Sequence, residues 1–189
     1  MASLSNYRAA LSQPTEQGAG RMLYCDLDRA LHWVRVHPRE HRSLAESPGE
    51  ADFTLVGRTR RALDTHLMTQ ALTEGIGNTL TSKMLSFPET RDVLGTTWIL
   101  TPDLAKIALE LAPRNQYGFY AEWPVTLWRS AENPLYVECE GLEWETPDRY
   151  MREIQAEGYE EWRKRFQTAA EWKKRTEMLR DFIESSLSS

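Results

Sequence analysis

The chain has 189 residues, of which 41% are hydrophobic and 27% are charged. This balance excludes a disordered chain, and the length fits one domain, or two very small ones. A domain of this size can fold without disulfide or metal staples. The formal net charge of −5 argues against duplex nucleic acid as the main partner, because duplex-binding proteins usually carry a basic excess.

The cysteines and the apolar runs bear on cellular location. Cys25 and Cys139 have neither a metal-binding nor a redox spacing, which favours two free thiols in a reducing cytoplasm. Residues 1–14 lack the basic start and apolar run of a secretory signal, and no apolar stretch approaches the length of a membrane span. We therefore expect a cytoplasmic protein with no membrane partner. Glycine-rich phosphate loops and dinucleotide fingerprints do not occur in the sequence, so we expect no cofactor.

The first part of the chain divides into a tail and the start of a core. Residues 1–20 are polar and rich in Ser, Gln and Gly, and we expect a tail or a short helix there. An α+β core should follow over residues 21–146. Asp26 is placed to cap a helix on which apolar residues recur at helical spacing. These residues are Leu27, Ala30, Leu31 and Val34.

The next segment alternates between a strand and helices. Residues 53–56 fit a short strand, and residues 59–73 fit a helix that Gly75-Ile76-Gly77 should stop. Asn78 is placed to cap a shorter helix that runs to about Leu85.

Three further runs have strand character. Residues 96–100 are β-branched and aromatic, and Thr101-Pro102 then begins a helix. Residues 117–128 and 135–145 alternate apolar and polar with a turn at Asn133-Pro134, which predicts an antiparallel hairpin or meander. The predicted fold is α+β, with a small, mostly antiparallel sheet packed with helices. Its strands should lie near residues 53–56, 96–100, 117–128 and 135–145.

The last segment, residues 147–188, has a helical pattern. Apolar residues recur at steps of three and four from Met151 to Leu187, which is the α-helical period. Gly158 should divide this run into a short helix and a long one.

The leading functional hypothesis is a non-catalytic protein-binding or assembly protein. The long terminal helix has an apolar side that must cover either its own domain or a partner. Trp162, Phe166 and Trp172 lie on that side, and large aromatic residues anchor interfaces as well as cores. The partner would be another protein or a second copy in a homo-oligomer. An inhibitor, an immunity-type protein, an adaptor or a complex subunit, including one of viral or mobile-element origin, would fit this pattern.

The same helix raises nucleic-acid binding as an alternative. Arg163 and Lys173 belong to basic clusters interleaved with aromatic residues, a combination found where single strands bind. Acidic residues lie four positions before several of these basic residues, and such spacing favours ion pairs within the helix.

A second alternative is phosphohydrolase activity. Asp26 and Asp28 follow an apolar run in a D-x-D pattern, and this resembles the first motif of the haloacid-dehalogenase-like phosphohydrolases. Thr101, at the end of a predicted strand, resembles the hydroxyl residue of that family's second motif. The resemblance implies that Asp26 attacks phosphorus, that Asp28 handles the proton and that Mg²⁺ binds nearby.

Two further groups of residues could bind metal. His37, Glu40 and His41 fit the H-x-x-E-H pattern, which resembles the zinc site of the inverted zinc metallopeptidases. Pro38 fits a helix through this motif poorly. The glutamates at positions 138, 140, 143 and 145 could do acid–base work, although such a face is usually the solvated side of a sheet.

Overall fold

The structure, a computed structural model, describes residues 8–9, 11–13, 20–46, 49–111 and 117–187. Most of the predicted N-terminal tail lies outside these residues, and the described residues 8–9 and 11–13 are helical.

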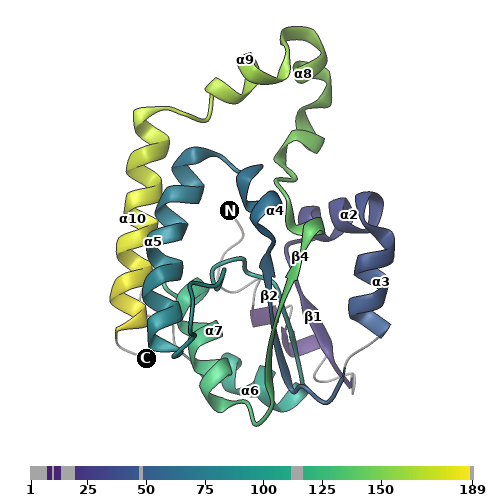
Figure 1. The fold of residues 1–189 in the computed structure, drawn as a ribbon, viewed down its shortest axis with the longest axis vertical. Coiled ribbons are helices and arrows are strands. Elements are labelled where there is room, and N and C mark those ends of the chain that lie inside the picture. The colour runs from purple at the N-terminus through teal and green to yellow at the C-terminus, as the bar shows by residue number, and fades with distance from the viewer. Residues whose placement is uncertain (1–7, 10, 14–19, 47–48, 112–116, 188–189) are drawn as a thin grey trace.

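A four-stranded mixed sheet forms the centre of the molecule (Figure 1). The strand order is β1-β3-β2-β4, in which β3 pairs antiparallel with β1 and β2, and β2 pairs parallel with β4. The carboxyl ends of β1, β2 and β4 therefore lie at one edge of the sheet, and β3 begins at that edge. The strands are β1 (Met22–Tyr24), β2 (Phe53–Arg58), β3 (Trp98–Leu100) and β4 (Pro134–Cys139).

Helices cover both faces of this sheet (Figure 1). α2 and α3 lie on one face, and α5, α6 and α7 lie on the other. α10 runs beside α5 and packs on α5 and α7, so it forms an outer layer. The segment between β4 and α10 contains two short 3-10 turns, followed by α8 and α9. Of these elements, α8 and α9 project beyond the sheet. The helices are α2 (Leu27–Val36), α3 (Pro38–Glu46), α4 (Arg60–Asp64), α5 (Met68–Met84), α6 (Pro102–Glu110), α7 (Phe119–Ser130), α8 (Met151–Glu157), α9 (Tyr159–Lys164) and α10 (Ala169–Ser186), and the turns are η1 (Glu140–Leu142) and η2 (Thr146–Tyr150).

An apolar core lies on each face of the sheet. Leu55 and Trp98 belong to the larger core, which includes Trp123 of α7. Val56 belongs to the smaller core, where it packs with Trp33 of α2. Leu55 and Val56 are neighbours on β2 and serve different cores because successive side chains of a strand point to opposite faces.

The structure confirms an α+β fold with a small sheet and a C-terminal helix. Three of the four predicted strands coincide with β2, β3 and β4, although β4 ends at Cys139 instead of continuing to residue 145. Thr101 and Pro102 begin α6, as their sequence predicts. Cys25 and Cys139 are both free.

The strand predicted over residues 117–128 is wrong, because this segment forms α7. Seven residues of this helix are buried, including Trp123 and Glu122. Apolar and polar residues therefore do not separate into a buried face and a solvent-exposed face. A helix that is buried nearly all round has no readable 3.6-residue period. The predicted hairpin therefore does not exist, and β4 pairs with β2.

The break predicted at Gly75-Ile76-Gly77 is also wrong. α5 continues through both glycines to Met84, and Asn78 lies inside the helix and does not cap a new one. The helical segment is interrupted earlier, between the end of α4 at Asp64 and the start of α5 at Met68.

The C-terminal apolar run is divided twice. Gly158 separates α8 from α9, as predicted, and its φ of 89° is a value that glycine adopts readily. A second break follows Lys164, and Thr168 then caps α10 by accepting a hydrogen bond from the backbone N–H of Glu171 at 3.3 Å.

Candidate functional site

α5 directs its polar side to the interior and its apolar side to the solvent. Met68, Leu72 and Ile76 have exposed fractions of 52%, 55% and 56%. They are four residues apart and therefore share one helix face. An ordinary amphipathic helix has the reverse orientation. The buried residues of α5 are Thr69, Gln70, Thr73, Glu74, Gly77, Asn78, Thr81 and Ser82.

Arg58 explains why α5 is oriented in this way. Its side chain lies fully buried at the end of β2. Its Nη2 donates a hydrogen bond to Oε2 of Glu74, on α5, at 2.6 Å, and it also binds Asp92. A buried charge is costly unless ion pairs and hydrogen bonds compensate it. The polar side of α5 supplies this compensation, so the apolar side is left outside.

Asn78 joins the same network from the middle of α5. Its Nδ2 donates to Oδ1 of Asp92 at 2.7 Å. Its Oδ1 accepts hydrogen bonds from the backbone N–H groups of Val93 and Leu94, each at 2.9 Å. The side chain thus satisfies buried backbone donors of the loop before β3 and fixes that loop on the helix.

The charges of this network persist over a wide pH range. Burial alone would raise the pKa of Asp92, but the charge of Arg58 and its hydrogen bonds outweigh burial and lower that pKa to about 2. Burial would lower the pKa of Arg58, but Asp92 and Glu74 raise it instead. Arg58 and Asp92 are therefore both ionised at neutral pH.

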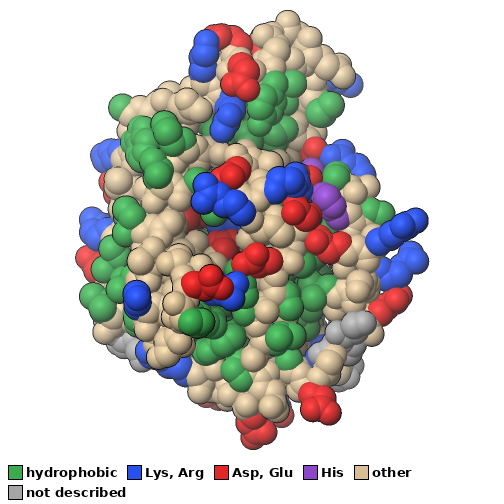
Figure 2. Space-filling model, viewed as in Figure 1, with side chains coloured by type: hydrophobic (Ala, Val, Ile, Leu, Met, Phe, Trp, Pro, Cys, Tyr) green, Lys and Arg blue, Asp and Glu red, His purple; other side chains and the backbone are tan. Residues whose placement is uncertain are grey.

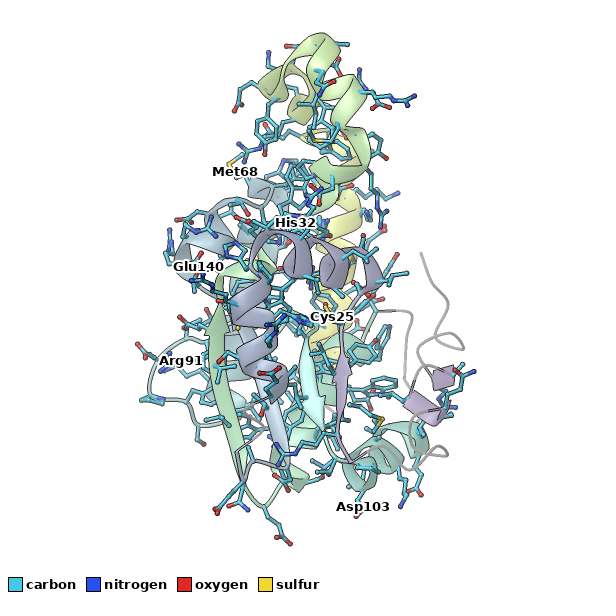
Figure 3. The ribbon with its side chains drawn as sticks, turned by 90° about the vertical axis from the view of Figure 1, so that its right-hand side faces the viewer. Cys25, His32, Met68, Arg91, Asp103 and Glu140 are labelled. Carbon is cyan, nitrogen blue, oxygen red and sulfur yellow. The ribbon has the colours of Figure 1, made fainter. Side chains whose placement is uncertain are left out.

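We call the solvent side of α5 the α5 outer face. Met68, the first residue of α5, points away from the body of the molecule (Figure 3). Hydrophobic side chains are exposed over α5 and α10 at the left of Figure 2, with charged side chains between them, and further charged side chains gather near the middle of that view. A Cβ added at Gly75 would meet nothing within 4 Å, so the space before it is open. The face consists of Met68, Ala71, Leu72, Gly75, Ile76 and Thr79, all exposed or half-buried and none charged; the exposed Lys83 follows it in the last turn of α5.

α2 shows the same inversion. Leu27, Leu31 and Val34 have exposed fractions of 75%, 63% and 48%, and they are three of the four apolar residues whose spacing predicts this helix. The buried residues of α2 are Arg29, His32 and Trp33. The pattern thus locates the helix correctly, but its apolar stripe faces solvent.

The aromatic residues predicted to bind a partner mostly pack within their own chain. Trp162 is fully buried, with its ring centre 5.5 Å from that of Trp144 and 4.9 Å from that of Phe166. Leu67 completes this cluster. Trp172 is half-buried on α10. Trp162 and Phe166 therefore anchor the projecting α8–α9 segment to the body of the protein.

The basic residues proposed for nucleic-acid contact lie on separate helices. Arg163 of α9 donates to the backbone oxygen of His66 at 3.3 Å. Lys173 of α10 lies 3.9 Å from the carboxylate of Glu177, four residues later. Glu171 forms an ion pair at 2.8 Å with Arg175, four residues later, which is the spacing expected to favour ion pairs within the helix.

The residues of the phosphohydrolase resemblance are not brought together. β1 and β3 are antiparallel, with Tyr24 opposite Trp98. Asp26 follows the end of β1, and Thr101 follows the end of β3, so the two lie at opposite edges of the sheet. Asp28 forms an ion pair with Arg149. The resemblance requires Asp26 and Thr101 to follow neighbouring parallel strands, whereas the strands that they follow are antiparallel.

The H-x-x-E-H residues are used in structural contacts. His37 ends α2, and its Nε2 lies 3.2 Å from a carboxylate oxygen of Glu143. Glu40 accepts hydrogen bonds from Nε1 of Trp33 and from the backbone N–H groups of residues 140 and 141, at 2.7 to 2.9 Å. The ring of His41 packs edge-on to that of Trp33. Within the described residues, no group of three or more His, Cys, Asp and Glu side chains could hold a metal ion.

Sequence reasoning missed the network of Arg58, Glu74, Asn78 and Asp92. One signal was present. Gln70, Glu74 and Asn78 form a polar stripe at the same four-residue spacing as the apolar stripe of α5. The pattern alone does not say which stripe is buried.

The comparisons with known proteins assign no family. No helix in the described part of the chain has the length and apolar character needed to cross a membrane. No protein-family model, curated protein or solved structure matches this chain.

Proposed function

We propose that this chain is a protein-binding, assembly-type protein without a catalytic step of its own, and that the α5 outer face is its contact surface. The observation that supports this proposal is the exposure of Met68, Leu72 and Ile76, each more than half exposed on one side of α5. Contiguous exposed apolar patches mark interaction sites on proteins. The partner that we propose for this face is a second copy of the chain.

The absence of charge on the face favours self-association. A two-fold interface brings the same patch of each subunit together, so a charged residue near the axis would meet its own sign. None of the six residues of the α5 outer face is charged. An antiparallel second copy would also place the positive N-terminal end of each α5 beside the negative C-terminal end of the other.

The shape of the face supports close packing of two helices. Ala71, Gly75 and Thr79 are small and four residues apart, so they form a shallow groove beside the larger apolar side chains. Helix pairs pack side chains of one helix into grooves of the other, with axes about 8–10 Å apart. The open space before Gly75 leaves room for such an approach.

Sedimentation velocity over a wide range of protein concentration tests the proposal. The native chain should pass from monomer to dimer as concentration rises. Leu72→Glu places like charges on both sides of the interface and should shift this transition at least tenfold upward. Leu31→Glu introduces the same change on the comparably exposed stripe of α2 and should leave the transition in place.

Three outcomes would contradict the proposal. The native chain could remain monomeric at every concentration. Leu72→Glu could leave the transition unchanged, or Leu31→Glu could be the variant that abolishes it. The last result would place the interface on α2.

We further propose a cytoplasmic location, which the two free thiols, Cys25 and Cys139, support.

A further inference from the structure

A cavity of about 190 Å³ lies on the inner side of α5, at the sheet edge where β1, β2 and β4 end. α5 and α10 supply one group of its lining residues, and α2 and residues 144–146 supply another. The cavity is partly open to solvent. Its volume is below the roughly 300–1,000 Å³ of sites for drug-sized ligands, so the cavity suits a small ligand.

Two buried polar atoms without partners come from the β2–α5 side of the cavity. They are Nη1 of Arg58 and Nε2 of His66, which no other described residue reaches with a hydrogen bond. The two residues line the cavity and are only 3% and 2% exposed. Native proteins pair nearly all buried polar atoms, so unpaired atoms on residues that line a cavity are candidate contacts for a polar ligand.

A second pair comes from α2 and the segment after η1. Nε of Arg29 and Oε2 of Glu145 lie 3.8 Å apart, and neither has a hydrogen-bond partner among the described residues. Arg29 is 7% exposed, and its Nη1 is already bound to the backbone oxygen of Gly95 at 2.5 Å. The gap between Nε and the carboxylate is too long for a direct hydrogen bond.

Each pair combines one donor with one acceptor. Burial, together with the charges of Arg58 and Arg29, lowers the pKa of His66 to about 2, so its ring is neutral. Nδ1 of His66 lies 3.1 Å from the backbone oxygen of Ala62 and donates its proton there, which leaves Nε2 as an acceptor. Arg58 and Arg29 supply the donors, and Glu145 supplies the second acceptor.

The charges of the lining cancel. Three arginines, at positions 29, 58 and 175, face three acidic residues, at positions 26, 74 and 145. A site for a phosphate or a carboxylate would carry a cationic excess. The remaining lining includes Leu94, Trp144, Met178 and Phe182, which are apolar and suit the faces of a ring.

We propose that this cavity binds a small uncharged cyclic amide, a ring whose edge carries an N–H donor beside a carbonyl acceptor. Such an edge complements a protein donor and acceptor pair: its carbonyl accepts from an arginine, and its N–H donates to the neighbouring acceptor. Two pairs in one cavity suit a ring with such groups on two edges, as in a pyrimidine base. This ligand site is separate from the α5 outer face and does not depend on self-association.

Ligand-observed NMR and calorimetric titration of the full chain test this inference. Uracil and 2-pyridone, two simple cyclic amides, should bind saturably. 1,3-Dimethyluracil lacks the donors and orotate adds a charge, so each should bind at least tenfold more weakly than uracil. Inorganic phosphate should not compete.

Matched variants locate the site. Thr146→Trp fills the cavity and should weaken uracil binding at least tenfold, whereas Thr176→Trp, on the exposed side of α10, should leave it within twofold. If Thr146→Trp fails to fold, Glu145→Leu removes one acceptor and should give the same loss. The inference is overturned if neither cyclic amide binds, if orotate or phosphate binds as tightly as uracil, or if these cavity variants leave binding unchanged.

Discussion

Arg58 and Asp92 form a bidentate ion pair in the interior of the protein. Nε and Nη2 of the arginine donate to the two carboxylate oxygens of the aspartate, at 2.6 and 2.8 Å. The backbone N–H of Arg58 also donates to the aspartate, at 2.9 Å. The pair joins the end of β2 to the loop before β3, and it requires the polar side of α5 to face inward.

Removing one charge of this pair should strongly destabilise the fold. Asp92→Asn leaves the Arg58 guanidinium buried with a single acidic partner, Glu74, and breaking a buried pair costs about 3–5 kcal/mol. Chemical denaturation measures this loss as a lower free energy of unfolding. The exposed pair of Arg60 and Asp64 provides the control, because Asp64→Asn should cost less than about 1 kcal/mol. Equal losses in the two variants would show that the buried pair has no special weight.

The two glycines of α5 should respond oppositely to alanine. A Cβ at Gly75 would meet open space, so Gly75→Ala should stabilise the helix by about 0.5–1 kcal/mol. A Cβ at Gly77 would lie 2.5 Å from Cδ1 of the buried Leu94, so Gly77→Ala should destabilise by about 1–3 kcal/mol. Thermal and urea unfolding of both variants would test the expected opposite signs. A stabilising Gly77→Ala would contradict the inward orientation of this side of α5.

His66 should make stability depend on pH in mildly acidic solution. Its pKa is about 2 in the folded protein and near 6.5 in an unfolded chain, because burial and the nearby arginines oppose its charged form. Between these values the unfolded chain binds a proton that the folded chain does not. The contribution is therefore fully present above pH 6.5 and declines as the pH falls, by at most about 1.4 kcal/mol per pH unit.

His66→Asn isolates this effect. The asparagine amide can still donate to the backbone oxygen of Ala62, but it does not titrate. Urea unfolding at pH 7.5 and 5.5 should show a smaller decrease in stability for the variant than for the native chain. Identical pH slopes would contradict a buried neutral histidine.

Trp162 should control the attachment of the α8–α9 segment. Trp→Ala substitutions in cores cost about 3–5 kcal/mol, and here the loss should fall mainly on this projecting segment. Hydrogen exchange of residues 151–166 should accelerate in Trp162→Ala while β2 and β3 stay protected. Trp172→Ala, at a half-buried position, is the control and should have a smaller effect. Uniform acceleration across the sheet would show that the segment unfolds only with the whole protein.

The sequence predicts elements where the local signal is strong. The β-branched and aromatic run at residues 96–100 predicts β3, and Thr101-Pro102 predicts the start of α6. It misassigns α7, because nearly every side of that helix is buried. It does not reveal the inversion of α5, because Arg58 and Asp92, which require it, lie outside the helix in sequence.

The candidate site residues also divide into those with a local sequence signal and those brought together only by the fold. The helical spacing places Trp162 and Phe166 on one apolar stripe, and the structure shows that these two side chains pack against their own chain. Glu145 belonged to a group of acidic candidates, yet its neighbour Arg29 in the cavity is 116 residues away in sequence. Such pairs depend on chain folding at the edge of the sheet, which local patterns do not contain.

Site-specific crosslinking tests the pairing of α5 outer faces most directly. Gly75→Cys places a thiol in open space near the middle of the face, where two copies should meet. Under mild oxidation this variant should form a covalent dimer, whereas the native chain and Leu31→Cys should remain monomeric on non-reducing gels. Crosslinking of Leu31→Cys but not of Gly75→Cys, or of neither variant, would contradict an interface formed by α5.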